Sequence, residues 1–188
     1  MQRPERKLNR HRNFDYSLDG CYFVTTRVKI FVCPFGKIQN DQMTLNKFGK
    51  IVKQQLLWLP KQYPYIRINE WCVMPDHVHA IIVIDRKNMG MDCAVGAFRE
   101  HVGTGLDLSL RSNIGTPSHT TTLSLSHIVG AFKTTSSKLI HQSGLPQFYW
   151  QRSFYDHVIR NETALEAIRW YIQNNPAKWR ENKNNLNQ

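Results

Sequence analysis

Two histidines stand two positions apart where an apolar stretch begins, in the sequence CVMPDHVHAIIVI of residues 72–84. Side chains alternate along a β-strand, so we expect His77 and His79 on one face and Val78 on the other. Two neutral imidazoles placed in this way can bind one divalent cation if another element supplies a third ligand. Ordinary polar residues on a half-exposed strand, or a hydrogen-bonded core histidine, would give the same pattern. Asp76 is interpreted as a turn residue and not as a ligand.

A second pair of polar residues lies in the sequence WYIQNNPAKW. Tyr171 and Asn175 are four positions apart and therefore share one face of a helix. A proline disfavours helical dihedral angles in the residue before it. The helix is therefore expected to end at Asn175, just before Pro176, with the Asn175 amide at an exposed tip. A phenol and a carboxamide on this face could lie opposite the histidine pair across a sheet. The alternative is a tyrosine packed on the core and an asparagine that caps the helix.

The elements that must position these residues follow from hydrophobic periodicity and from turn residues. The expected strands cover residues 21–32, 65–74, 77–84 and, as a short strand or ribbon, 147–160. The expected helices cover residues 43–64, 123–144 and 161–175. This order predicts an α+β fold close to the ferredoxin-like plan, with an antiparallel sheet and helices on one face.

The length of 188 residues fits one domain that can bury its own core. We expect this domain over residues 20–180, after a polar basic arm over residues 1–19 and before a frayed tail over residues 181–188. Residues 85–122 are rich in Gly, Ser and Thr and show no sustained period. They predict a long loop or insertion within the domain.

The chain is strongly basic, with 25 Lys and Arg against 14 Asp and Glu and a formal net charge of +11. Such an excess favours a polyanionic partner, nucleic acid before a membrane, although a merely soluble basic protein is the alternative. No stretch approaches the ~20 apolar residues that span a bilayer, and the N-terminus lacks the apolar region of a secretory signal. The cysteines are scattered, which fits reduced thiols. These features predict a cytoplasmic protein without a membrane partner.

Three segments, CVMPDHVHAIIVI, FYWQRSFYDHVIRNE and AIRWYIQNNPAKW, resemble in this order the single-tyrosine HUH transposases. They are most similar to the REP-associated tyrosine transposase branch, which is associated with repetitive extragenic palindromes. The opening FDYSLDGCYFVTTRV is similar to the first strand of that branch. The resemblance extends from about Phe14 to Trp179 apart from residues 85–122, and its Pro-Asp-His-x-His and Tyr-Ile-x-x-Asn-Pro blocks are specific only together. It implies the HUH endonuclease fold.

The resemblance also implies a role for each matching residue. His77 and His79 correspond to the histidines that hold a divalent metal, Mg²⁺ or Mn²⁺. Tyr171 corresponds to the nucleophile on the helix after the fourth strand. Asn175 corresponds to a helix position from which many relatives supply a third ligand as glutamine. Because asparagine is one methylene shorter, it reaches the metal only if the helix lies closer, and otherwise water takes its place.

The implied reaction is cleavage and rejoining of a DNA strand. A metal at the histidines would bind non-bridging oxygens of the scissile phosphate and stabilise the charge that develops there. Attack by Tyr171 yields a 5′-phosphotyrosine and a free 3′-hydroxyl, so one phosphodiester replaces another and the step can reverse without ATP. Tyr155 is the next candidate for the nucleophile, although this tyrosine is expected to stack on bases or to pack in the core.

The expected substrate is single-stranded or hairpin DNA, because the attacked strand must be accessible. Basic side chains that contact phosphates give salt-dependent affinity with little sequence information. The residues expected to contact DNA are Arg10, Arg12, Lys133, Lys138, Trp150, Arg152, Arg160, Arg169 and Lys178. Among them, Trp150 is expected to stack on a base, and Arg152, Arg160, Arg169 and Lys178 are expected around the histidines. The basic arm could enter a groove or follow a hairpin stem, or it could be a solvated tail.

Three alternative functions share parts of this pattern. A domesticated DNA-binding protein on the same fold would bind without cutting. A metal-dependent hydrolase would turn over without a covalent adduct and would need a carboxylate, which the strand does not supply on the histidine face. A replication initiator or relaxase uses the same chemistry but is usually larger. The sequence leaves open whether a monomer or a homodimer forms the site.

Overall fold

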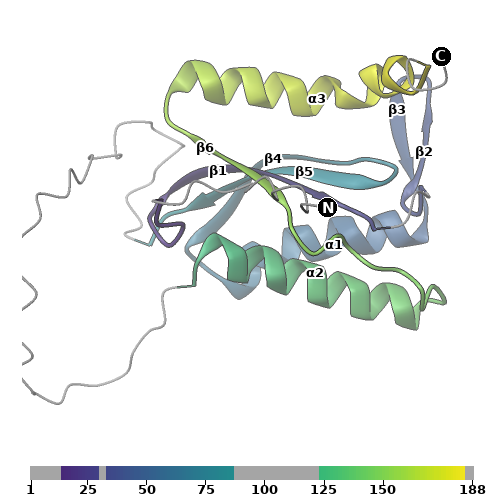
Figure 1. The fold of residues 1–188 in the computed structure, drawn as a ribbon, viewed down its shortest axis with the longest axis horizontal. Helices are drawn as coiled ribbons and strands as arrows, with labels where there is room; N and C mark the ends of the chain where they lie inside the picture. The colour runs from purple at the N-terminus through teal and green to yellow at the C-terminus, as the bar shows by residue number, and fades with distance from the viewer. Residues whose placement is uncertain (1–13, 30–32, 87–122, 185–188) are drawn as a thin grey trace, which may run out of the picture.

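The computed structural model describes residues 14–29, 33–86 and 123–184. Within these residues a four-stranded sheet, a two-stranded hairpin and three helices form (Figure 1). The strands of the larger sheet are β1 (Gly20–Arg27), β4 (Ile66–Val73), β5 (His77–Ile84) and β6 (Tyr155–Ile159). The helices are α1 (Lys47–Gln62), α2 (Leu125–Gln142) and α3 (Glu162–Asn184).

The larger sheet has the strand order β4-β5-β1-β6, and each neighbouring pair is antiparallel. Together with α1 and α2, these strands follow the βαββαβ order of a ferredoxin-like fold. The predicted α+β class and its antiparallel sheet are therefore confirmed. Central position explains why β5 is buried along its whole length, since it pairs with β4 and β1 and has helices on both faces.

The two faces of the sheet carry separate cores. Val78, Ala80 and Ile82 of β5 belong to the larger core, on the face that α1 and α2 cover. Ile81 and Val83 belong to a smaller core under α3, on the opposite face (Figure 1). The expectation of helices on one face thus holds for α1 and α2, whereas α3 forms an additional layer. This layer is the one that covers the histidines.

A β-hairpin that was not predicted from the sequence precedes α1. β2 (Gly36–Gln39) and β3 (Gln42–Leu45) pair in antiparallel register around Asn40 and Asp41. Both turn residues have positive φ angles, 49° and 59°, as a type I′ turn requires. The helix expected from residue 43 therefore begins only at Lys47, where the side chain of Asn46 accepts hydrogen bonds from two backbone amides of the first turn.

The last helix continues where the sequence analysis expects it to end. α3 passes through Pro176 and reaches Asn184, so the expected end at Asn175 and the exposed tip are wrong. Asn175 is only 8% exposed. A proline inside a helix removes one backbone hydrogen bond. The contacts that the extra turns make with β2, β3 and the ring of His77 oppose this loss.

Other expectations fall wholly or partly outside the described residues. Most of the basic arm, nearly all of the loop at 85–122 and the last four residues of the tail are among them, so these predictions stay untested. Cys21 is disulfide-bonded, so the expectation of reduced thiols is wrong for this residue, whereas Cys72 is a free thiol. None of the helices in the described part of the chain is long and apolar enough to cross a membrane.

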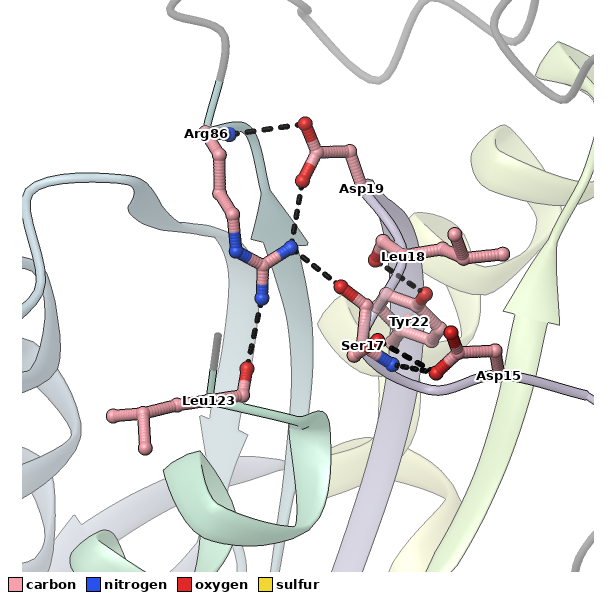
Figure 2. A network of polar contacts seen from close by, with 7 residues as sticks. All are labelled: Asp15, Ser17, Leu18, Asp19, Tyr22, Arg86 and Leu123. Carbon is pink, nitrogen blue, oxygen red and sulfur yellow. Dashed lines mark hydrogen bonds and ion pairs between the residues drawn. The ribbon is translucent and has the colours of Figure 1, made fainter. Parts of the chain in front are cut away.

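Arg86 joins the end of β5 to the residues before β1 and α2 (Figure 2). Its guanidinium Nη1 donates to the carbonyl of Ser17 at 2.5 Å and to Asp19 Oδ1 at 2.8 Å. Its Nη2 donates to the carbonyl of Leu123 at 2.8 Å, and its backbone amide donates to Asp19 Oδ2 at 3.1 Å. Since residues 86 and 123 stand on either side of segment 87–122, one side chain fixes both flanks of this segment.

We expect Arg86→Met to lower the free energy of unfolding by about 2–3 kcal/mol, because charge-assisted hydrogen bonds of a half-buried guanidinium are lost. Urea denaturation followed by circular dichroism measures the change. Arg160→Met is the matched control, since Arg160 is exposed at the end of β6 and its replacement should change stability by less than about 0.5 kcal/mol. Equal midpoints for the two variants would contradict a structural role of Arg86.

Candidate active site

The rings of the two histidines converge on the α3 side of the sheet. His77 Nε2 and His79 Nε2 are 2.9 Å apart, and the two residues are 5% and 4% exposed. The other nitrogen of each ring is anchored. His77 Nδ1 lies 2.5 Å from Asp76 Oδ1, and His79 Nδ1 lies 2.8 Å from Thr25 Oγ1. The predicted common face of the two histidines is therefore confirmed, and the anchors fix the direction of both rings.

These contacts form one continuous hydrogen-bond chain that assigns the proton positions. An ionised carboxylate only accepts, so His77 Nδ1 carries a proton and donates it to Asp76. Nε2 of a neutral His77 then accepts from Nε2–H of His79. The Nδ1 atom of His79 in turn accepts from the hydroxyl of Thr25. Every ring nitrogen is satisfied while both imidazoles stay neutral.

The electrostatic environment keeps His79 uncharged. Burial, and to a smaller extent the proximity of His77, lower the pKa of His79 to about 3. The guanidinium of Arg27 is 3.7 Å from Asp76 Oδ2, so a cation faces the carboxylate that contacts His77. A neutral imidazole is the form that binds a metal ion, so the charge state of His79 suits a metal ligand at neutral pH.

Neither of the two anchoring residues is among the site residues predicted from the sequence. Asp76 does precede β5, as expected of a turn residue, but its carboxylate contacts His77 instead of only shaping the turn. Alternation along the strand gives no information about a residue outside the strand. Thr25 stands directly opposite His79 in the register of β1 and β5. A sequence signal for it would require knowledge of this register.

Tyr171, Asn175 and Trp179 form one face of α3 over the histidines. The ring of Tyr171 meets the ring of His79 edge to face, with 5.2 Å between centroids. The ring of Trp179 lies 5.4 Å from that of His77. Asn175 is placed between these two aromatic residues, on the same face, and it is buried. A single chain thus brings together the four residues that the sequence analysis selects.

Phe23 of β1 completes the surroundings of the candidate nucleophile. Its ring stacks on His79 at 5.5 Å and meets Tyr171 at 6.1 Å and Tyr155 at 6.3 Å. Tyr171 is 42% exposed, so a substrate can reach it although the histidines behind it are buried. Tyr155 contacts Phe23, whereas Tyr171 contacts a histidine directly. This difference favours Tyr171 over Tyr155.

Several basic residues expected to contact DNA lie on or near α3. Arg169 donates from Nε to Asn69 Oδ1 at 2.8 Å and is 3.7 Å from a carboxylate oxygen of Glu162, so its charge is partly engaged within the protein. The ammonium of Lys178 lies 4.2 Å from the ring centroid of the exposed Trp170. Together with exposed Arg160, these positions stay candidates for phosphate contacts.

Other expected DNA contacts lie elsewhere or outside the described residues. Lys133, Lys138 and Arg152 line a groove beside α2, and α2 lies on the face of the sheet opposite to α3. Trp150 is 8% exposed and donates from Nε1 to a serine hydroxyl of α2, so its expected role in base stacking is wrong. Arg10 and Arg12 lie outside the described residues.

No protein-family model matches the chain. An uncharacterized protein of Haemophilus influenzae is 34% identical over 178 residues, which cover 95% of this chain and 92% of that protein. The structure of a REP-associated tyrosine transposase bound to a REP hairpin matches with a TM-score of 0.51 and 19% identity, over 90% of this chain and 73% of that one. A crystal structure of a candidate transposase from Deinococcus radiodurans R1 matches with a TM-score of 0.45 and 16% identity, over 88% and 95%.

These comparisons carry two conclusions. The match with the Haemophilus influenzae protein is long and similar enough to show that this chain and that protein belong to one family. The structural match with the REP-associated transposase shows a transposase-like fold. At such low identity it shows the fold alone.

In the protein without added metal we expect His77 as the Nδ1–H tautomer and His79 as the Nε2–H tautomer at pH 7, because the hydrogen-bond chain requires this arrangement. Long-range ¹⁵N–¹H correlation spectra of ¹⁵N-histidine-labelled protein measure both. Thr25→Val should shift the resonances of His79. Thr26→Val is the matched control, since Thr26 faces the opposite core and should leave His79 unchanged. The same tautomer in both rings would contradict the chain.

Proposed function

We propose that this chain is a metal-dependent, single-tyrosine HUH transposase of the REP-associated type, which cuts and rejoins a DNA strand through a covalent bond to Tyr171. The observation that carries the proposal is the direct ring contact between Tyr171 and His79, beside two imidazole nitrogens 2.9 Å apart. The fold shared with a transposase bound to a REP hairpin supports DNA as the substrate.

The donor atoms fit a divalent cation. The two Nε2 atoms, 2.9 Å apart on one face of β5, would hold one divalent cation once both lone pairs are free. Among the described residues, no group of three or more His, Cys, Asp or Glu could hold a metal ion. The remaining ligands would thus be the amide oxygen of Asn175, water and the substrate.

Imidazole ligands favour Mn²⁺ over Mg²⁺, because Mg²⁺ prefers oxygen ligands and gives up water reluctantly. The bound cation would neutralise charge on the scissile phosphate. Binding requires a free lone pair on both Nε2 atoms. The Nε2 proton of His79 must therefore leave, and the ring can carry a proton at Nδ1 instead. Thr25 suits both states, since its hydroxyl can donate to this nitrogen or accept from it.

Tyr171 supplies the nucleophile. Its phenol oxygen forms a bond to phosphorus as the bond from phosphorus to the 3′ oxygen breaks. The phenol gives up one proton and the departing 3′ oxygen gains one, so no water is consumed. The product remains a phosphodiester, and a 3′-hydroxyl can attack it to rejoin the strand. Contacts with Phe23 and His79 on one side hold the ring, while its exposed part faces the solvent from which DNA approaches.

A metal-dependent hydrolase is the second candidate, because the structure does place a carboxylate beside the histidines. The carboxylate of Asp76 contacts His77 Nδ1 and lies near the guanidinium of Arg27. Its engagement with these cations and donors suits an anchor better than a general base. A hydrolase would release both DNA fragments over many turnovers, and a domesticated DNA-binding protein would release none.

Tyr171→Phe is expected to abolish a covalent adduct between the protein and hairpin DNA in the presence of Mn²⁺, because the attacking oxygen is lost. Denaturing gels with 3′-labelled DNA measure it, since the protein stays with the 5′ phosphate of the downstream fragment. A 5′-labelled strand should give a free fragment instead. Tyr155→Phe is the matched control and should keep the adduct. An adduct that persists without the Tyr171 hydroxyl, or cleavage without any adduct, would contradict the proposal.

Asp76→Asn is expected to weaken binding of Mn²⁺ about 10- to 100-fold, because the partner that orients the ring of His77 and raises its basicity is lost. Isothermal titration calorimetry on the protein without DNA measures the affinity. Asp41→Asn, in the exposed turn of the hairpin, is the matched control and should bind normally. Combined His77→Ala and His79→Ala should eliminate the site. Unchanged affinity in Asp76→Asn would contradict the role of the anchor.

A further inference from the structure

A basic groove lies beside α2, on the side of the sheet away from the histidine pair. Its volume is about 630 Å³, and α2 and residues 149–152 form its walls. Lys138 and Arg152 line it and are exposed, so their charges face solvent. Lys133 also lines it, but its ammonium donates to the backbone carbonyls of Gln151 and Ser153, which ties the two walls together.

The groove presents no negative charge. None of the residues that line it is acidic, and residues 123–155 contain no aspartate or glutamate at all. An anion that enters the groove therefore meets cations without the repulsion that mixed surfaces give. A polyanion would be attracted over the whole length of this wall.

Tyr149 gives the groove a flat aromatic surface. Its side chain is 55% exposed, whereas the next residue, Trp150, is buried. The ring of His141 supports it from the side at 5.8 Å, and His141 is itself fixed by a 2.7 Å contact between its Nε2 and the carbonyl of Phe148. The backbone carbonyl of Tyr149 accepts from the amide of Lys29 at 2.8 Å. The backbone of Tyr149 and one side of its ring are thus supported by neighbouring residues.

We propose that this groove is a second site for single-stranded DNA, in which a base stacks on Tyr149 and the flanking phosphates contact Lys138 and Arg152. An exposed aromatic ring next to cationic side chains is the combination by which proteins hold unpaired strands. A duplex could use the cations but not the ring, since its bases are already stacked. The inference rests on the proposed function, because it takes DNA as the substrate. It adds a holding site that is separate from the cutting site.

The experiment measures binding of a fluorescent oligothymidine by anisotropy, in EDTA and in the Tyr171→Phe background, so that neither metal nor covalent chemistry contributes. Tyr149→Ala is expected to weaken binding about ten-fold, whereas Tyr149→Phe keeps the stacking surface and should bind normally. Lys138→Gln and Arg152→Gln should each reduce the slope of log affinity against log salt by about 0.7. Lys61→Gln, at the end of α1, is the matched control and should not change the slope.

A direct readout accompanies these affinities. Irradiation of an oligonucleotide that contains 5-iodouracil should crosslink the base to Tyr149, and mass spectrometry identifies the peptide. The inference is overturned if Tyr149→Ala binds as tightly as Tyr149→Phe, if the crosslinks form only near Tyr171, or if Tyr149→Ala weakens a duplex as much as a single strand. The unfolding midpoint of each variant establishes that it is folded.

A failure of this inference can be distinguished from a failure of the proposed function. A covalent adduct of the wild-type protein with unchanged DNA binding in Tyr149→Ala overturns the second site alone. If Tyr149→Ala loses binding and the wild-type protein forms no adduct in Mn²⁺, the cutting reaction alone is overturned. Retained cutting of a short strand by Tyr149→Ala supports two separate sites.

Discussion

The short contact between the two histidine rings is the feature on which the rest of the site depends. Two imidazole nitrogens can approach to 2.9 Å as a hydrogen bond only if one carries a proton and the other offers a lone pair. Burial supplies the neutrality, and the anchors Thr25 and Asp76 supply the direction. Because buried polar groups without partners cost free energy, this chain of hydrogen bonds also allows histidines to stand where the rest of β5 is core.

The length of α3 follows from the same constraint. Tyr171 contacts His79 and Trp179 contacts His77, so the helix crosses the pair in the direction opposite to β5. Eight helical residues rise about 12 Å, whereas two strand residues span about 7 Å. The two aromatic side chains must therefore lean toward each other, with Asn175 between them. A helix that ended at Asn175 would leave His77 without its cover. Continuation through Pro176 closes the buried end of the site.

The sequence predicts the parts of the site that obey a local period. Alternation in β5 places both histidines, and helical spacing places Tyr171 and Asn175 on one face, as the structure confirms. The end of α3 is wrongly predicted, because the preference of a residue before proline is local and contacts with the β2–β3 hairpin and the histidines override it. The hairpin itself escapes prediction since Asn40 and Asp41 lack the glycine that signals its turn. The anchor at Thr25 depends on strand register, which no local pattern contains.

One strand connects the proposed cutting and holding sites. Thr25 and Arg27 of β1 contact the histidine chain through His79 and Asp76. At the same end of β1, the carbonyl of Arg27 accepts from the amide of Gln151, and the amide of Lys29 donates to the carbonyl of Tyr149. Backbone hydrogen bonds therefore fix the wall of the basic groove to the strand that anchors the metal ligands. A strand of DNA held in the groove would then pass around the edge of the sheet to reach the tyrosine.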